Sequence, residues 1–385
     1  MKRLTAMAVT AVLLNMLLCA CGLAKIQENK SESVINIVKT DGNDGKDNEK
    51  NGANNKKMCG MWVATVSNID FPSDTGLGED KLKSEIDNIV NDASEYGVNA
   101  IFLQVRPKSD AIYKSDIFPS SSVVVEKQGD RLPFDILSYF IEAAHKNNIE
   151  LHAWINPYRI NNSSSSEKGH DLSLLAYNNP ARLHQDWVVK HKFESGGKTM
   201  YAMYYNPGLP QVRNLILDGI IELVENYDID GVHMDDYFYP YDNASGFDDS
   251  EAYEKYGGSL DIGDWRRSNN DKLVEEIHNY ISACGKNISF GISPCGVWAK
   301  KTSSMPEGTE GIGNTIQAYY DIYADTRKWV INKWVDYICP QVYWQIDHSK
   351  APFKPIVDWW DDLCGTAEAA LYIGIGCLLY TSRCV

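Results

Sequence analysis

The sequence predicts an α/β protein of the (β/α)8 TIM-barrel class, and three observations support this. From Met58 onward, short apolar strand-like segments alternate with amphipathic helix-like segments through seven repeats, as is typical of a parallel sheet covered by helices. The predicted inner face of each strand carries at least one polar residue near the strand's end, where barrel enzymes place their chemistry. Neither G-x-G-x-x-G nor G-x-x-x-x-G-K-[ST] occurs, which removes the usual nucleotide-binding reasons for an open, doubly wound sheet.

Side-chain periodicity assigns the elements in order. Strands are predicted at 58–66, 99–106 and 151–156, within 227–240, and at 288–293, 337–344 and 371–376. Helices are predicted at 81–96, 134–147, 210–227, 267–283, 318–334 and 355–364. In the first helix Leu82, Ile86, Ile89 and Ala93 share one face, and Gly97 follows as a stop. The connections after the third, fourth and fifth strands are long, and active-site loops of barrels grow on that face.

The first 57 residues read as an export signal and a linker. Lys2 and Arg3 precede an apolar run from Leu4 to Leu18, which is too short to span a membrane and predicts a signal peptide over residues 1–20. The run ends in L-C-A-C, which resembles a bacterial lipobox, so we expect Cys21 to carry a lipid; ordinary secretion with cleavage nearby is the alternative. Residues 21–57 are polar and predict a disordered tether. We therefore expect an exported protein of the cell envelope, held at a bacterial membrane by its lipid alone.

Charge and cysteine usage exclude several classes of protein. The net charge is −15 and the pI near 5.0, and such a surface repels phosphate backbones, so no nucleic-acid partner is expected. The five cysteines between 58 and 376 show no C-x-x-C or Cys/His spacing, which argues against a disulfide framework and against a zinc site. The 22 Tyr, 10 Trp and 10 Phe favour a binding cleft.

The strongest candidate site is the stretch from Tyr227 to Pro240, YDIDGVHMDDYFYP, in which a short strand ends in two carboxylates. Alternation puts Val232 and Met234 on the outer face and Asp235 on the inner face, while Asp236 falls where the strand gives way to a loop. Carboxylates at the carboxyl end of a barrel strand are typical catalytic residues. The alternative is that both aspartates cap a turn.

Further candidates lie at or beyond the ends of the predicted strands and would line a carbohydrate site, because hydroxyls need polar partners and sugar faces stack on aromatics. The candidate substrate-binding residues are Arg106, Asn156, Tyr158, Arg159, His233, Tyr237, Tyr239, Trp298, Gln341, Tyr343 and Trp344. Arg106, Asn156 and Arg159 are interpreted as substrate positioners, with a structural hydrogen-bond network as the alternative. A metal site built from His152, His233 and Asp235 is a weaker alternative, since lone strand histidines are mostly core residues; no cofactor is expected.

Several blocks in order resemble the glycosyl-hydrolase-like family 10, a group of exported bacterial barrel proteins. They are GMWVATV near residue 60, FLQVRPKSDAIY from Phe102, HAWINPYR from His152, YNPGLPQVR from Tyr205, DGVHMDDYFYP from Asp230, GISPCGVW from Gly291 and PQVYW from Pro340. The resemblance covers about residues 58–376. It implies a glycoside hydrolase cleaving O-glycosidic bonds of a polysaccharide, with bacterial cell-wall glycan strands as the substrate class.

The central block is also similar to the family 18 chitinase signature D-G-x-D-x-D-x-E. Asp230 and Asp235 match, but His233 and Tyr237 occupy the second-Asp and catalytic-Glu positions, so the chitinase acid is not carried over. Glycoside hydrolysis normally uses two carboxyl groups. Our hypothesis is that Asp235 is the nucleophile or base, and that Asp236 or a loop acid supplies the second function. The candidate loop acids are Asp70, Asp110, Asp321 and Asp347.

The last nine residues, CLLYTSRCV, break the alternating pattern. We expect the barrel to be truncated after its seventh strand, with two open edges, and residues 377–385 to form an irregular tail that is foreign to the natural reading frame. Two other functions stay open: a non-catalytic glycan-binding barrel, and a non-glycosidic hydrolase such as a deacetylase, which would need a metal triad. The sequence does not predict an oligomeric state.

Overall fold

A computed structural model describes residues 57–242 and 244–376. The predicted signal peptide, Cys21, the predicted tether up to residue 56 and the tail 377–385 lie outside the described residues. Every helix in the described ranges is too short or too polar to cross a lipid bilayer.

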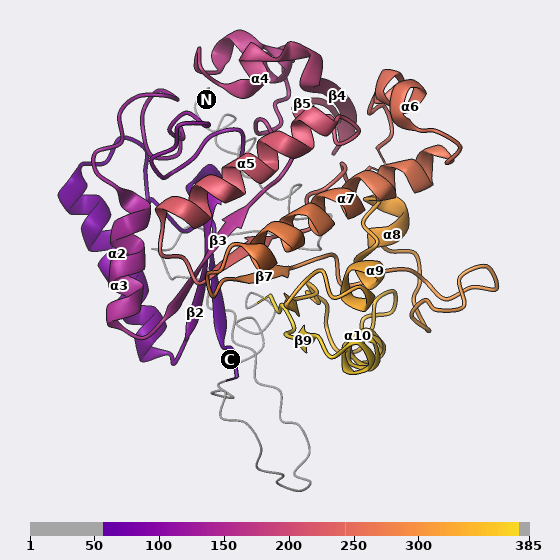
Figure 1. Cartoon of the computed structure of the whole chain (residues 1–385). Helices are drawn as coiled ribbons and strands as arrows, with labels where there is room; N and C mark the ends of the chain where they lie inside the picture. The colour runs from indigo at the N-terminus through magenta and orange to yellow at the C-terminus, as the bar shows by residue number, and fades with distance from the viewer. Residues whose placement is uncertain (1–56, 243, 377–385) are drawn as a thin grey trace, which may run out of the picture.

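A parallel sheet of seven strands forms the centre of the described chain, in the order β1-β2-β3-β6-β7-β8-β9. The strands are β1 (Gly60–Val63), β2 (Ala100–Arg106), β3 (Glu150–Ile155), β6 (Gly231–Met234), β7 (Ser289–Ile292), β8 (Tyr337–Ile338) and β9 (Ala370–Leu371). The sheet curls into part of a barrel, with its helices on the outer side (Figure 1). Seven parallel strands were predicted and are confirmed. The described residues contribute no eighth strand to this sheet.

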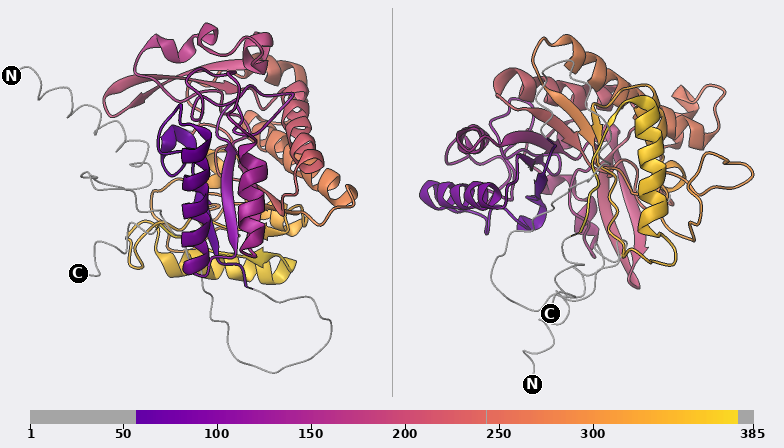
Figure 2. Two further views of the ribbon diagram at one scale, coloured as in Figure 1. Left: turned by 90° about the vertical axis from the view of Figure 1, so that its left-hand side faces the viewer. Right: turned by 90° about the horizontal axis from the view of Figure 1, so that it is seen from below.

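The helices follow the strands in chain order and cover the outer face of the sheet. The longer ones are α2 (Glu79–Glu95), α3 (Ile136–Lys146), α5 (Pro210–Asn226), α7 (Ile262–Ala283) and α10 (Phe353–Ala367). Helix α2 packs on α3 and α5 on α7, as two views show (Figure 2). Capping residues determine where several helices begin. Asp135 and Asp261 cap the N-termini of α3 and α7 through their side chains, and Pro210 is the first residue of α5.

Several predicted elements are shorter than expected; the strand predicted at 58–66 is Gly60–Val63, and the strand predicted at 371–376 is Ala370–Leu371. The helix predicted at 318–334 is divided into α8 (Ala318–Asp321) and α9 (Thr326–Ile331), because Tyr323 between them has a positive φ of 51°, which no helix tolerates. The strand predicted at 337–344 ends at Ile338, close before Pro340, which has no N–H for a ladder. Gln341 resumes the pairing as single bridges to Cys295 and Gly374.

The interior of the curled sheet is filled by a compact aromatic and histidine cluster. Trp62 Nε1 donates to His233 Nε2 at 3.3 Å, so the proton of His233 is on Nδ1, which donates to Tyr337 Oη at 3.1 Å. The Tyr337 hydroxyl then donates to His152 Nδ1 at 2.8 Å. Burial, with the neighbouring His152, lowers the pKa of His233 well below its usual value. This cluster fills the interior between the strands, so we expect a functional site at the carboxyl ends of the strands.

An antiparallel hairpin, absent from the prediction, rises from the long connection after β3. Strands β4 (Val188–Ser195) and β5 (Lys198–Tyr205) pair along their full length and turn at Gly196 and Gly197, whose φ angles of 57° and 72° suit a hairpin turn. The Tyr205 N–H donates to the Tyr158 carbonyl, which ties the hairpin to the chain just after β3. The hairpin and the short helix α4 (Pro180–Leu183) lie together at the top of Figure 1.

Candidate active site at the carboxyl ends of the strands

Asp235 follows the last residue of β6 and is 4% exposed. Its Oδ2 accepts hydrogen bonds from Asn156 Nδ2 at 2.5 Å and from Trp154 Nε1 at 3.1 Å, and its Oδ1 accepts one from the Tyr237 N–H at 3.0 Å. Trp154 lies on β3 and Asn156 follows directly after it, so two neighbouring strand ends build this carboxylate site. Both oxygens are held by donors, which favours the ionised form.

Arg159 supplies positive charge close to Asp235. Its guanidinium stacks on the Tyr237 ring at 4.0 Å, and its charge acts on the Asp235 carboxyl. Burial raises the pKa of Asp235 above its usual value, and the charge of Arg159, followed by the hydrogen bonds from Tyr237, Asn156 and Trp154, works against that rise. Asp235 is therefore a buried carboxyl with a dedicated set of groups that stabilise its negative charge.

Asp236 is as buried as Asp235, at 5% exposed, but its surroundings differ. Burial, together with the charge of Asp235, raises the pKa of Asp236 to about 7, and hydrogen bonding with Tyr241 and Gln341 only partly opposes this. Near neutral pH the pair therefore shares its charge unequally, with Asp235 as the carboxylate and Asp236 as the site of the proton.

Asp236 opens into a groove formed by the loops after β6, β7 and β8. The residues that line it are Asp236, Tyr241, Cys295, Thr315, Ile316, Gln341, Tyr343 and Trp344. Gly296 brings two of these loops together, since a Cβ there would lie 2.4 Å from the Gln341 carbonyl oxygen and 2.9 Å from the Trp344 ring. The predicted residues Asp236, Gln341, Tyr343 and Trp344 are thus brought together, and Asn156, Arg159 and Tyr237 surround the adjoining Asp235.

Sequence reasoning missed several residues of this site. Trp154 was not among the predicted site residues, although its indole N–H reaches Asp235. Tyr241, Thr315 and Ile316 come from loops, where no periodicity indicates which side chains point inward. Only the aromatic run after Asp236 gave a local signal for Tyr241.

The prediction that Arg106 faces inward is wrong. The register of β2 against β3 shifts between Gln104 and Arg106, and such an irregularity turns the following side chains to the other face. The Arg106 guanidinium instead lies 4.7 Å over the ring of Phe118, and Phe118 contacts Gly219 of α5 on the outer side of the sheet.

Four more predicted site residues lie away from the groove. Tyr158, 1% exposed, belongs to the main apolar core, and His233 lies in the closed interior cluster. Tyr239 packs edge-to-face on Phe247. Trp298 stacks on Trp359 and donates its indole N–H to Asp325. Their aromatic and polar character serves packing, which is the commoner use of such residues.

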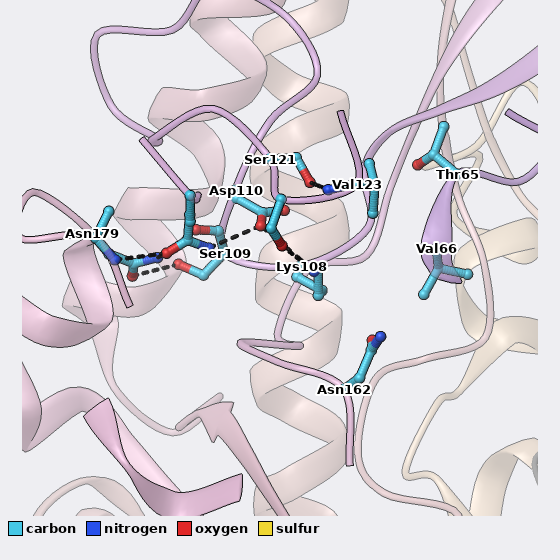
Figure 3. A network of polar contacts seen from close by, with 12 residues as sticks. Thr65, Val66, Lys108, Ser109, Asp110, Ser121, Val123, Asn162 and Asn179 are labelled. Atoms are coloured by element: carbon cyan, nitrogen blue, oxygen red, sulfur yellow. Dashed lines mark hydrogen bonds and ion pairs between the residues drawn. The ribbon is translucent and has the colours of Figure 1, made fainter. Parts of the chain in front are cut away.

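The loop acids proposed as partners of Asp235 have other contacts. Asp70 accepts from the Ala64 N–H, and Asp321 from the Gln317 N–H. Asp110 lies in a separate polar network with Lys108 and Gln128, near the Ser109–Asn179 hydrogen bonds (Figure 3). Asp347 is exposed. Asp236 is therefore the carboxyl beside Asp235. In the described ranges no three His, Cys, Asp or Glu side chains gather as a metal-binding group.

The chain is similar in sequence to a family and to individual proteins that are described as glycosyl hydrolases or glycosyl hydrolase-like. Residues 57–379 match the family model described as "Glycosyl hydrolase-like 10". The glycosyl hydrolase YngK of Bacillus subtilis (strain 168) is 40% identical over 327 residues, which are 84% of this chain and 61% of that protein. The glycosyl hydrolase DigH of Escherichia coli (strain K12) is 34% identical over 330 residues, 83% of this chain and 72% of that protein.

Among solved structures, a cycloisomaltooligosaccharide glucanotransferase of Paenibacillus sp. aligns with 80% of this chain and 39% of its own, at 13% identity and a TM-score of 0.43.

Proposed function

The chain belongs to the glycosyl hydrolase-like 10 family, and on that premise we propose that it is a glycoside hydrolase in which Asp236 is the general acid and Asp235 the nucleophile or base. The observation that carries the proposal is the unequal pair at the end of β6. Burial and its neighbour's charge raise the pKa of Asp236 to about 7, whereas three hydrogen-bond donors and Arg159 act on Asp235. Two carboxyls with separated protonation states are what glycoside hydrolysis requires.

The proposed reaction assigns a different role to each carboxyl. Asp236 gives its proton to the glycosidic oxygen, the bond from that oxygen to the anomeric carbon breaks, and the leaving chain departs as an alcohol. Asp235 either takes a proton from the water that attacks the anomeric carbon, or bonds to that carbon itself. In the second case Asp236, now ionised, takes a proton from a water that attacks the anomeric carbon, the bond to Asp235 breaks, and the sugar is released. Arg159, fixed on the Tyr237 ring at 4.0 Å, stabilises the negative charge of Asp235 before the attack.

We propose a polysaccharide of the cell wall as substrate, reached by a lipid-anchored protein outside the cytoplasm. The groove offers Tyr343 and Trp344 as flat apolar surfaces and Gln341 as an amide beside Asp236, a combination that suits the faces and hydroxyls of a sugar chain. The predicted signal peptide and Cys21 support the location. The chain spans 61% of the length of YngK.

The test is incubation of the full chain with purified peptidoglycan, with and without its stem peptides, followed by mass analysis of the products. New reducing-end fragments are expected, and Asp235→Asn and Asp236→Asn are each expected to lower the rate about 10²–10⁴-fold. Asp361→Asn, at an exposed position of α10, is the matched control and should keep the full rate. Intact strands that stay bound to the wild-type protein would contradict hydrolysis and favour the glycan-binding alternative.

A further inference from the structure

Hydrogen bonds link Asp235 to Asn156 and Asn156 to Gln104. The backbone contacts of Gln104 decide which group donates at each of these links. Gln104 of β2 is 1% exposed, and its Oε1 accepts from the backbone N–H groups of Thr65 at 3.0 Å and Val66 at 2.9 Å. A backbone N–H can only donate, so the oxygen of the Gln104 amide must be at this end. The Thr65 hydroxyl also donates to the Gln104 carbonyl at 2.7 Å and holds the backbone in place.

Gln104 in turn orients the side-chain amide of Asn156. Gln104 Nε2 lies 2.6 Å from Asn156 Oδ1, and because Nε2 can only donate, the oxygen of Asn156 faces Gln104. Asn156 Nδ2 therefore faces Asp235 Oδ2 at 2.5 Å. Asn156 is fully buried, which leaves it no water with which to exchange these partners. Without Gln104, the Asn156 amide could turn and present its oxygen to a protonated Asp235.

We infer that Gln104 is a positioning residue that fixes which end of the Asn156 amide meets Asp235. The inference rests on the proposed function, in which Asp235 works as a carboxylate. A locked Asn156 donates to the carboxylate and offers no acceptor to the acid form, so it favours the charged state. Gln104 does not touch the reacting atoms; it acts through Asn156.

Two substitutions at Gln104 separate this role from simple packing. Gln104→Met removes the donor to Asn156 without adding charge, so the Asn156 amide is free to turn and accept a hydrogen bond from protonated Asp235. Gln104→Glu keeps an acceptor for the Thr65 and Val66 N–H groups but presents a second acceptor to Asn156, which locks the turned orientation. The proton affinity of Asp235 should therefore rise from wild type to Gln104→Met, and rise further in Gln104→Glu, where the added negative charge contributes as well. The shift in Gln104→Met is the one that reports the turn of Asn156.

The readout is a ¹³C-carboxyl NMR titration of Asp235, assigned with Asp235→Asn. It is carried out in the Asp236→Asn background, so that Asp235 titrates without its coupled neighbour. Arg159 then remains as the charged group facing Asp235 in the described structure. The pKa of Asp235 is expected to rise by about one unit in Gln104→Glu, which corresponds to the loss of one hydrogen bond to a charged group. A smaller rise in this pKa is expected for Gln104→Met. If Gln104→Glu does not fold, Gln104→Met alone decides.

Two controls make the result specific. In the Asn156→Ala background Gln104→Met should add no further shift, because the inferred effect passes through Asn156. Gln128→Glu makes the same chemical change in a separate network, where Gln128 Oε1 accepts from the Ala176 N–H and Nε2 donates to Asp110; it should leave the Asp235 titration unchanged.

An unchanged titration in Gln104→Met, or an equal shift without Asn156, would overturn the inference. The measurement needs no substrate, so it is independent of the proposed activity. If the Asp235 titration shifts in the Gln104 variants but the wild-type protein cleaves no glycan, only the proposed function is contradicted. If the wild-type protein is active but the Asp235 titration does not shift in the variants, only the role of Gln104 is contradicted.

Discussion

Asp235 and Asp236 are consecutive in the chain, yet the structure surrounds them with different chemistry. The strand geometry directs Asp235 toward β3, where Asn156 and Trp154 donate to it, and the start of the loop directs Asp236 into the groove beside Tyr241 and Gln341. The difference in proton affinity therefore comes from one change of backbone direction between two identical side chains.

The raised pKa of Asp236 predicts a pH-dependent cost to stability. Its folded pKa of about 7 exceeds the ordinary aspartate value of 3.8, so between those values the folded state binds more protons than the unfolded state. This stabilising contribution is present at low pH and is lost as pH rises toward 7, at about 1.4 kcal/mol per pH unit. Asp236→Asn removes this loss of stability at higher pH, because asparagine stays neutral.

Asp236→Asn should therefore match the wild-type free energy of unfolding near about pH 3.5, below both pKa values, and exceed it by about 2–4 kcal/mol near about pH 8. Urea unfolding at both pH values measures this. Asp361→Asn, on the surface of α10, is the control and should follow wild type at both. Equal loss of stability in wild type and Asp236→Asn on raising the pH would contradict the assignment of the proton to Asp236.

At the scale of elements, β6 and β7 depend on glycines that let side chains cross the barrel interior. A Cβ at Gly231 would lie 2.1 Å from the His152 ring, and one at Gly291 would lie 2.0 Å from the Tyr337 ring. Real Cβ atoms do not approach this closely, so these two positions require glycine. The interior cluster that supports the site from below is thereby tied to the two central strands.

Gly291→Ala is expected to destabilise the protein by at least about 2 kcal/mol, because the buried Tyr337 ring has no space to move. The helix α10 offers the matched control: a Cβ at Gly365 would meet nothing within 4 Å, so Gly365→Ala should be neutral or stabilise by up to about 1 kcal/mol. Chemical denaturation of both variants measures the two effects. A Gly291→Ala protein as stable as wild type would show that the interior is looser than described.

The hairpin β4–β5 shows where element prediction failed and why. Val189 to Glu194 of β4 mixes apolar and polar residues, β5 is rich in aromatic residues, and Gly196 and Gly197 lie between them, which is a usable hairpin signal. The alternating scheme of strands and helices nevertheless treated 157–209 as connection, because a locally paired hairpin lies outside the repeating unit. By contrast, the helices at 81–96, 134–147 and 210–227 were predicted to within about two residues of α2, α3 and α5, since amphipathic periodicity is a local property.

At the scale of the whole molecule, the curl of the sheet gathers the ends of distant strands at one mouth. Residues from the loop after β1 to the loop after β8 meet there, from Thr65 through Asn156 and Asp235 to Trp344. Helices cover the outer face instead (Figure 2), so chemistry is confined to the end where the loops emerge.

The net charge of −15 predicts that the protein does not bind nucleic acid. A gel-shift assay with duplex DNA at about 50 mM salt, where electrostatic binding is strongest, should show no retarded band at about 10 µM protein. Raising the salt to about 200 mM should change nothing. A band that appears at low salt and disappears at high salt would reveal a basic surface that the overall charge conceals.

The sequence by itself determined the order of the seven strands of the central sheet and of the longer helices, and the position of Asp235 at a strand end, because these follow from backbone periodicity within a few residues. Tertiary structure alone decided that Arg106 turns outward, that the Asn156 amide is locked by Gln104, and that Asp236 keeps its proton near neutral pH. A register shift, an amide direction and a burial cost each depend on groups far apart in the chain, and only the curled sheet brings those groups into contact.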